Sequence, residues 1–541
     1  MDFIFINGKI YTMNFDSFEE ELAHLPEAVL VRDGRIQAVG ALSDVREVAG
    51  PDVVMKDLGG RCLMPGFIDG HSHISLNGEM ATWADLANCS SHAEIVEELR
   101  RFATEKKIDK NGVIVGFGYD HNFLAEKSHP EKTVLDLVSS EIPVFIMHVT
   151  GHFGCVNSAA LEKVGFDEHT PDPKGGVIVR YPGSMEPTGY LEEMAMEEAR
   201  RILIFSMEKD EDAIMEAMQE TYIKNGITTV QDGETRAQDM HLLEKMNEAN
   251  ALKVDVISYP TMMDGGVKLL HEKEEYTHGY KGRLRIAGYK LVLDGSPQGR
   301  TAWMSKPYLN GEEGYCGFPW VSDEDVRKLL RTALKERRQV LAHCNGDAAS
   351  EQFLSAYETV SRELGIEEDL RPVMIHCQTV RNDQLDRMAR LNMIASIFVG
   401  HVWYWSDIHL VNFGPERGHH ISPCADALKR GVKINFHQDT PITSPNMLHS
   451  VWCAVNRISR GGQIVGAEQK ISAYSAFKAI TIDAAYEYFE EKEKGSIEVG
   501  KRADLVILDR SPFEVDPTRI RDIKVWETIK DGVVIYKKEE L

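Results

Sequence analysis

Strand-like apolar runs alternate with amphipathic helical patterns through the middle of the chain, and this alternation most limits what the sequence can fold into. Helical patterns such as 213–224 and 324–336 lie between the runs. The strand-like runs are 66–71, 226–232, 252–259, 284–294, 338–344, 371–377, 393–399 and 431–438. Eight strands that alternate with helices predict an α/β fold, a parallel (β/α)8 barrel of the TIM type.

Both ends of the chain have a different sequence pattern, which predicts short strands joined by tight turns. Asn7-Gly8 and Asp33-Gly34 are each flanked by short apolar runs, so two N-terminal hairpins are predicted. Further strand candidates near the C-terminus are 503–508 and 530–536. We therefore expect residues 1–64 and 490–541 to form one small, β-sandwich-like domain, with the barrel, 65–489, inserted between them.

The stretch from about 80 to 205 is too long for one βα unit and predicts an inserted subdomain after the first strand. It contains a helix-like pattern over 93–107, a strand over 143–148 and a turn-rich segment over 171–176.

Composition excludes some classes of protein. A net charge of −24 and a pI of about 5.3 argue against nucleic-acid binding, which needs a basic surface. The N-terminus lacks the pattern of a secretory signal, and no apolar run reaches the roughly 18 residues of a membrane span. Eight scattered cysteines without a Cys-x-x-Cys pair fit reduced thiols in a cytoplasmic protein.

We expect a small-molecule substrate, and the oligomeric state stays open.

Two histidines, His71 and His73, end the first strand-like run, in Met-Pro-Gly-Phe-Ile-Asp-Gly-His-Ser-His. Residues i and i+2 of a strand point to the same side, so both imidazoles face one space. A bare His-x-His is more often a polar loop, but the preceding strand and the partners downstream favour a divalent-metal site.

Four further candidates, Lys290, His343, His376 and Asp439, lie at or near the ends of later strands. A barrel repeat is about 30 residues. About one repeat therefore separates His343 from His376, and about two repeats separate His376 from Asp439. The longer gap between His73 and Lys290 is explained by the insertion. The spacings therefore predict a single site at one mouth of the barrel.

Each of these residues has a chemical reason to be there. A charged lysine is costly to bury in so apolar a strand, whereas a neutral amine reacts with carbon dioxide to give a carbamate that can bridge two cations. Asp439 is a candidate ligand, a candidate base for metal-activated water, or both. Zinc is the favoured metal, although iron and manganese share these ligands.

With these six residues in this order, the chain resembles the amidohydrolase superfamily. Neighbouring motifs narrow the resemblance to the amidohydrolase-3, YtcJ-like branch, and together they cover nearly the whole chain. They are Asp172-Pro173-Lys174-Gly175-Gly176, Glu186-Pro187-Thr188-Gly189, Gly226-Ile227-Thr228-Thr229-Val230, Asp294-Gly295-Ser296 with Arg300-Thr301-Ala302, His343 with Gly346-Asp347, and the segment 495–506.

The resemblance implies one or two divalent metals and hydrolysis of a C–N bond in an amide, an N-acyl or N-formyl compound, or a cyclic urea. It implies His71, His73 and Asp439 on the more buried metal, and a carboxylated Lys290 as the bridge. It implies His343 and His376 on the second metal. One departure is Gln438 before Asp439, where relatives often have serine, so the hydrogen bonding of the base differs.

Other residues are candidates for contact with the substrate. His152 matches a histidine that recurs in this branch and would polarise the scissile carbonyl, although a helix-capping role is equally consistent. Trp303, Tyr404 and His401 are candidates to line a substrate pocket. The remaining histidines considered, His121, His148 and His437, are expected to be structural.

Two alternatives remain open from the sequence. One is a mononuclear deaminase of the same superfamily, against which the strand lysine argues. The other is a non-catalytic regulatory or ligand-binding barrel, against which the complete set of candidate ligands argues.

Overall fold

The computed structural model describes residues 2–204 and 210–539, and the chain divides into two compact units. The first unit comprises Met1–Ser75, Gln219–Gly317 and Ser322–Leu541, and the second comprises Leu76–Met218 and Phe318–Val321. The predicted insertion, about 80–205, falls inside the second unit. Within the described ranges, no helix is both long and apolar enough to cross a bilayer.

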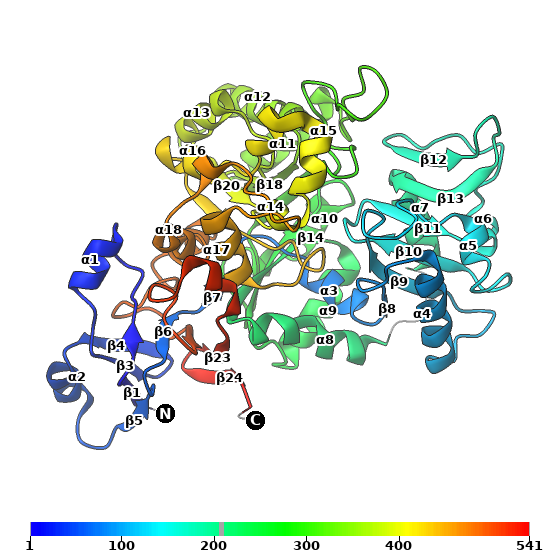
Figure 1. Cartoon of the computed structure of the whole chain (residues 1–541). Helices are drawn as coiled ribbons and strands as arrows, with labels where there is room; N and C mark the ends of the chain where they lie inside the picture. The colour runs from blue at the N-terminus through cyan, green and yellow to red at the C-terminus, as the bar shows by residue number, and fades with distance from the viewer. Residues whose placement is uncertain (1, 205–209, 540–541) are drawn as a thin grey trace. The chain divides into compact units, whose positions relative to one another are not determined.

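Parallel strands form the framework of the first unit (Figure 1). Their bounds are β7 (Phe67–Ile68), β14 (Ile227–Thr235), β15 (Asp255–Pro260), β16 (Leu284–Ile286), β17 (Gly288–Val292), β18 (Gln339–Cys344), β19 (Val373–His376), β20 (Ile394–Ile397) and β21 (Ile434–Phe436). One sheet has the order β16-β15-β14-β7 and the other β17-β18-β19-β20-β21, with all neighbours parallel. Every strand-like run of the middle of the sequence overlaps one of these strands, and the run 284–294 is divided into β16 and β17.

Backbone contacts also join the two sheets. Thr261 forms a parallel bridge with Lys290, and the amide of Gly70 donates to the carbonyl of Phe436 at 3.3 Å. One apolar cluster collects side chains from both sheets, namely Ile68, Ile257, Tyr259, Leu341, Val373, Ile375 and Ile394. The two sheets therefore share a common core.

Helices connect the parallel strands. They are α9 (Ala237–Glu248), α10 (Gly266–Glu272), α11 (Asp323–Lys335), α12 (Asp347–Leu364), α13 (Asn382–Arg390), α14 (His401–Tyr404), α15 (Ser406–His419) and α16 (Cys424–Lys429), with α17 (Met447–Asn456), α18 (Ala473–Lys478) and α19 (Ile482–Glu487) after β21. The helix α11 shows why they form. Ser322 caps its first turn by accepting from the amide of Asp325, and Val326, Leu330 and Ala333 bury one face.

Residues from both ends of the chain pair in one sheet. Its strands are β2 (Lys9–Ile10), β6 (Cys62–Pro65), β22 (Leu505–Leu508), β23 (Val525–Lys530) and β24 (Val533–Lys537), in that order across the sheet. A second sheet has the order β4-β3-β1-β5, from β1 (Phe3–Ile6), β3 (Ala28–Arg32), β4 (Arg35–Gly40) and β5 (Val54–Asp57). The hairpin at Asp33-Gly34 is confirmed, since β3 and β4 pair antiparallel.

The predicted hairpin at Asn7-Gly8 is wrong. The strands on either side, β1 and β2, belong to different sheets, and the amide of Lys9 donates to the carbonyl of Arg61. Asn7 is in the left-handed region with φ of 58°, and a Cβ on Gly8 would lie 2.5 Å from that same carbonyl oxygen. The chain therefore turns at Asn7-Gly8, but the two strands pair with segments distant in sequence and not with each other.

The second unit contains a six-stranded sheet in the order β12-β13-β11-β10-β9-β8. Its strands are β8 (Ala84–Asp85), β9 (Ile114–Tyr119), β10 (Val144–His148), β11 (Phe153–Val156), β12 (Gly176–Arg180) and β13 (Pro187–Glu193). The strands β8, β9 and β10 are parallel, and β10 to β13 are antiparallel. The predicted helix and strand of this stretch correspond to α4 (His92–Glu105) and β10.

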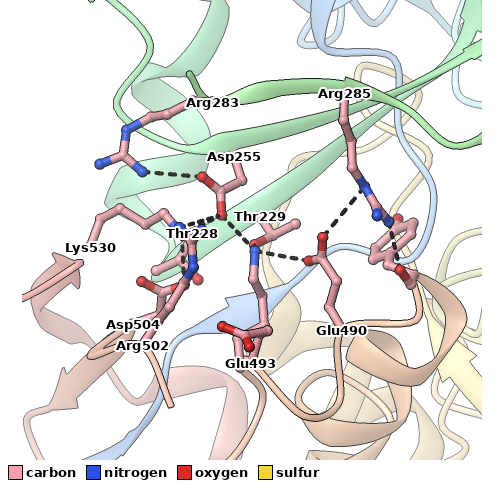
Figure 2. A network of polar contacts seen from close by, with 12 residues as sticks. Thr228, Thr229, Asp255, Arg283, Arg285, Glu490, Glu493, Arg502, Asp504 and Lys530 are labelled. Carbon is pink, nitrogen blue, oxygen red and sulfur yellow. Dashed lines mark hydrogen bonds and ion pairs between the residues drawn. The ribbon is translucent and has the colours of Figure 1, made fainter. Parts of the chain in front are cut away.

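A buried ionic network joins the start of β15 to the C-terminal strands (Figure 2). Asp255 Oδ2 lies 2.6 Å from Lys530 Nζ and 2.5 Å from Lys494 Nζ, and Arg283 pairs with the other oxygen at 3.1 Å. Asp504 also contacts Lys530 at 2.6 Å. Because these carboxylates and amines are almost fully buried, their mutual pairing is what makes their burial tolerable.

Candidate metal centre

The six predicted ligands lie at one end of the parallel strands. His71 and His73 follow β7, and Lys290 is in β17. His343 is in β18, His376 ends β19, and Asp439 follows β21. Because parallel strands run in one direction, their carboxyl ends meet at the same edge, which is where this fold class places its sites.

Asp439 lies between two imidazoles. Its Oδ1 is 3.5 Å from His71 Nε2 and 3.3 Å from His73 Nε2. Burial alone would raise the pKa of Asp439, but the neighbouring imidazoles of His73, His376 and His71 hold it well below its ordinary value. Asp439 is therefore ionised at neutral pH.

Lys290 is buried directly beside His71. Its Nζ lies 2.9 Å from His71 Nε2, and the residue is 1% exposed. Burial lowers the pKa of Lys290 to about 8, partly offset by the charges of Asp439 and Glu234. A neutral amine is therefore accessible close to physiological pH.

His343 and His376 form the other side of the cluster. Their ring centroids are 4.4 Å apart, and the ring of His376 is 5.8 Å from that of His71. Burial, followed by the neighbouring charge of His343, lowers the pKa of His376 well below its ordinary value. The imidazole of His376 is therefore neutral, which is the form that binds metals.

These residues fit a divalent cation. Within the described part of the chain, the buried Oδ1 of Asp439 has no hydrogen-bond partner, although two imidazole nitrogens lie close to it. His71, His376 and Asp439 each offer one ligand atom, and these atoms lie within 4.8 Å of one another. Imidazole and carboxylate groups are both zinc donors. The Asp439 carboxylate beside the neutral imidazoles of His71 and His376 is therefore a suitable binding site for such an ion.

Two of the predicted ligands have a strained backbone. His376 has φ of 75° and Asp439 has φ of 54°, in the left-handed region that residues other than glycine rarely adopt. Each such conformation costs on the order of 1–3 kcal/mol and persists only where the surroundings impose it. The fold therefore holds these two side chains in place at an energetic cost.

Three further residues orient the predicted ligands. His437 was expected to be structural, Asp294 was noted only as part of a motif, and Gln231 was not singled out. Asp294 Oδ1 lies 3.2 Å from His343 Nδ1, and the Asp294 carboxylate also accepts from the amides of Asn345 and Gly346. His437 Nε2 lies 3.2 Å from His376 Nδ1. Gln231 Oε1 contacts His71 Nδ1. A partner on one ring nitrogen fixes the direction of the other, which is how proteins orient metal-binding histidines.

Behind Gln231 lies a buried carboxyl group, Glu487, at the end of α19. The Gln231 amide donates to Glu487 Oε1 at 3.2 Å and to the hydroxyl of Tyr488 at 3.0 Å. Burial raises the pKa of Glu487 to about 8, partly offset by its bonds with Asn435 and Gln231. A polar glutamine inside the apolar strand-like run 226–232 was the signal for this network, whereas Glu487 had no local signal.

Gln438 does not take part in orienting the base. Its amide donates to the carbonyl of Asn446 at 2.8 Å, and its oxygen accepts from the hydroxyl of Thr443 at 2.8 Å. The side chain of Gln438 is therefore directed to the segment that follows Asp439.

Of the remaining predicted site residues, two lie in the first unit near the buried ligands. His401 is 3% exposed, and its ring is 4.8 Å from that of Phe398, which itself lies 6.2 Å from His376. Trp303 is half-buried, and its backbone amide donates to Asp294 Oδ2 at 3.0 Å.

Tyr404 and His152 have surroundings of their own. Tyr404 packs at 5.6 Å from the ring of His449, and burial raises its pKa to about 12. His152 belongs to the second unit, where its Nδ1 lies 2.8 Å from Glu193 Oε2. Contact of these residues with a substrate stays a prediction.

Comparison with known proteins decides the family. The model of the amidohydrolase family, Amidohydro_3, matches residues 55–536. The chain belongs to the amidohydrolase family. This amidohydrolase is therefore a hydrolase of carbon–nitrogen bonds other than peptide bonds, and its family has the TIM-barrel-type α/β fold.

Similar proteins span the whole amidohydrolase. It is 28% identical to an N-substituted formamide deformylase of Arthrobacter pascens, over 99% of this chain and 98% of the relative. It is 27% identical to the putative amidohydrolase YtcJ of Bacillus subtilis, over 99% of this chain and all of the relative. A crystal structure of an uncharacterized metal-dependent hydrolase from Pyrococcus horikoshii covers 96% of this chain and 99% of the other, with a TM-score of 0.75 and 26% identity. The resemblance drawn from the sequence is confirmed.

Proposed function

We propose that this amidohydrolase cleaves a non-peptide C–N bond of a small molecule, an amide, an N-acyl or N-formyl compound, or a cyclic amide. Its two parallel sheets close into an eight-stranded barrel over 65–489, and residues 1–64 and 490–541 form one composite β-domain. The observation that most supports the proposal is the Asp439 carboxylate, which lies within 3.5 Å of two imidazole nitrogens while its Oδ1 has no hydrogen-bond partner among the described residues.

One or two divalent metal ions, with zinc as the favoured metal, would be held by six residues. They are His71, His73, Lys290, His343, His376 and Asp439. Lys290 would join as a carbamate, because its lowered pKa leaves part of the amine neutral and able to react with carbon dioxide. When bound, a divalent cation supplies Lewis acidity, which lowers the pKa of water and polarises a carbonyl group.

Asp439 is proposed as the proton carrier. It is ionised at neutral pH, so it can accept a proton from the attacking water and return it to the leaving nitrogen. Asp294, His437 and Gln231 hold the ligand imidazoles in one orientation, so the site does not need to reorganise during the reaction.

The substrate class follows from the relatives rather than from the pocket. One relative is an N-substituted formamide deformylase, so N-formyl and N-acyl amines are the first compounds to assay. His152 is proposed to polarise the carbonyl, and Trp303, Tyr404 and His401 to contact the substrate. We further propose a cytoplasmic protein that binds neither nucleic acid nor membranes.

The test combines metal analysis with a substrate screen. Wild-type protein should contain one or two equivalents of divalent metal and hydrolyse at least one N-formyl or N-acyl amine. Asp439→Asn should reduce kcat by about 10²–10⁴-fold, the contribution of a positioned base. His278→Gln, a change at a histidine whose side chain is 71% exposed, is the matched control and should leave activity unchanged.

Other outcomes would support the alternatives. One metal equivalent that is unaffected by Lys290→Ala, together with release of ammonia from a cyclic amidine, would indicate a mononuclear deaminase. Metal-loaded protein that binds amides and hydrolyses none would indicate a ligand-binding barrel and would refute the proposed activity.

A further inference from the structure

A second cluster of imidazoles lies within the second unit. His121 and His129 follow β9, and His148 ends β10. These strands are parallel neighbours with Tyr119 opposite His148, so their carboxyl ends meet at one edge of the sheet. The three histidines each offer one ligand atom, and these atoms lie within 4.8 Å of one another.

The distances resemble those between atoms that share one small cation. His121 Nδ1 lies 3.1 Å from His148 Nε2. Asp120 Oδ1 is 3.6 Å from His148 Nε2 and 3.9 Å from His121 Nδ1. Donor atoms bound tetrahedrally to zinc at about 2.0–2.1 Å are separated by roughly 3.3 Å, so small adjustments suffice.

The outer nitrogens of two of these rings have fixed partners. His148 Nδ1 is 3.0 Å from Thr150 Oγ1, and His129 Nδ1 is 2.9 Å from the hydroxyl of Tyr119. These contacts, with the backbone amide of Thr150 that also donates to His148 Nδ1 at 3.3 Å, hold the two rings in one orientation, as the partners of metal-binding histidines do. Burial, followed by the charges of His121 and His148, also lowers the pKa of His129 well below its ordinary value, so its ring is neutral.

Asp120 supplies the negative charge that such a site needs. Burial would raise the pKa of Asp120, but the hydrogen bond and charge of His148 hold it below its ordinary value. The three imidazoles lie close together, and Asp120 adds a carboxylate oxygen within 3.9 Å of two of them. Imidazole and carboxylate groups are both zinc donors.

We propose that His121, His129, His148 and Asp120 bind one divalent transition-metal ion, Zn²⁺ or its analogue Co²⁺, and that this ion stabilises the second unit. The site is separate in its residues from the six ligands of the proposed catalytic metal. Without the ion, the same residues would form only a hydrogen-bonded aromatic stack, in which His129 lies 4.0 Å from the ring of Tyr190 and 4.1 Å from that of His121.

The experiment removes the first site and counts the metal that remains. In the full chain with His71→Ala and His73→Ala, titration with Zn²⁺ followed by calorimetry should show one remaining strong site. Co²⁺ in that site should give the intense visible absorption of a four-coordinate ion. Adding His148→Gln should abolish both signals, whereas adding His169→Gln, at a histidine with an 84% exposed side chain, should leave them unchanged.

A measurement on the otherwise wild-type protein guards against misfolded variants. Purified protein should contain one equivalent more zinc than the single variant His129→Gln, and removal of that equivalent should lower the temperature at which the second unit becomes sensitive to protease. If the variant that lacks His71 and His73 is folded by circular dichroism and binds no Zn²⁺, the proposed site does not exist. Retention of the cobalt spectrum in His148→Gln would also overturn it.

Discussion

At the residue scale, the protonation state of the Lys290 amine determines whether the proposed carbamate ligand can form. Its pKa of about 8 leaves about 10% of the amine neutral at pH 7, whereas an ordinary lysine would have far less than 1%. Only the neutral amine reacts with carbon dioxide, so the neutral fraction, and with it carbamate formation, rises as the pH increases through 8.

The first prediction concerns reloading of metal-free protein with zinc. Uptake should increase when bicarbonate is added and should be faster at pH 8.5 than at pH 7, because both changes favour the carbamate of Lys290. Lys290→Ala should abolish the response to bicarbonate, while Lys268→Ala, at a lysine with a 79% exposed side chain, should retain it. Uptake that is insensitive to bicarbonate in the wild-type protein would contradict a carboxylated lysine.

A second prediction concerns the buried carboxyl group of Glu487. With its pKa raised to about 8, the folded protein keeps a proton on this group at pH values where the unfolded chain has already lost it. The contribution of this group to the free energy of unfolding therefore falls as the pH rises from about 4.5 towards 8, by an amount on the order of 5 kcal/mol.

The substitution Glu487→Gln should remove this loss. Asn435 can rotate its amide to accept from the new group, because its Oδ1 has no hydrogen-bond partner within the described ranges. Thermal unfolding midpoints at pH 5 and pH 8 should therefore differ less for the variant than for the wild type. Equal changes in both proteins would show that Glu487 ionises normally.

At the element scale, the strands were predictable because each has its own apolar pattern. The run 338–344 corresponds to β18, Gln339–Cys344, and places His343 at the carboxyl end of the strand. The predicted ligands could be proposed for the same reason, since each lies in, or shortly after, a recognisable strand. The partner strands of β1 and β2 could not be predicted from Asn7-Gly8, because sheet pairing between distant segments leaves no local signature.

The residues that orient the ligands were harder to predict than the ligands. Asp294 was noted only as part of a motif, yet it receives hydrogen bonds from three backbone amides in addition to its contact with His343. Glu487 reaches the site from a helix near the end of the chain. Such contacts depend on how the elements pack, and one sequence does not encode that packing in any local pattern.

A third prediction follows from how closely β14 approaches His71. A Cβ on Gly233 would lie 2.3 Å from His71 Cε1 and 2.6 Å from its Nδ1, so the imidazole would have to move. Gly233→Ala should weaken zinc binding at the first site by about 10–100-fold, the usual cost of disturbing the partners of a ligand. The measurement is competition for zinc with a chelator of known affinity.

A glycine in open surroundings provides the control for this change. A Cβ on Gly311 would meet no atom closer than 3.7 Å, so Gly311→Ala should bind zinc as the wild type does. If both variants retain full affinity, His71 is less confined than the structure indicates, and its role as a ligand is weakened.

At the scale of the whole molecule, the network around Asp255 explains how the C-terminal strands are attached to the parallel strands. Lys530 ends β23, Asp504 precedes β22, and Asp255 begins β15 (Figure 2). Burial would raise the pKa of Asp255, but Lys494, Lys530 and Arg502 lower it below its ordinary value. A carboxyl group of lowered pKa stabilises the fold above about pH 4, and this contribution is lost as the pH falls.

The fourth prediction tests this attachment. Asp255→Asn leaves the buried amines of Lys494 and Lys530 with too little negative charge, so the folded state should lose about 3–5 kcal/mol, the usual cost of breaking a buried ion pair. The exposed pair of Lys9 and Glu514 is the control, and Glu514→Gln should cost less than about 1 kcal/mol. The network lies at the amino-terminal start of β15, whereas the metal ligands lie at the carboxyl ends of the strands, so zinc bound per folded molecule should be unchanged in Asp255→Asn. Loss of metal without loss of thermal stability would mean that the network serves the site instead of the attachment of the C-terminal strands.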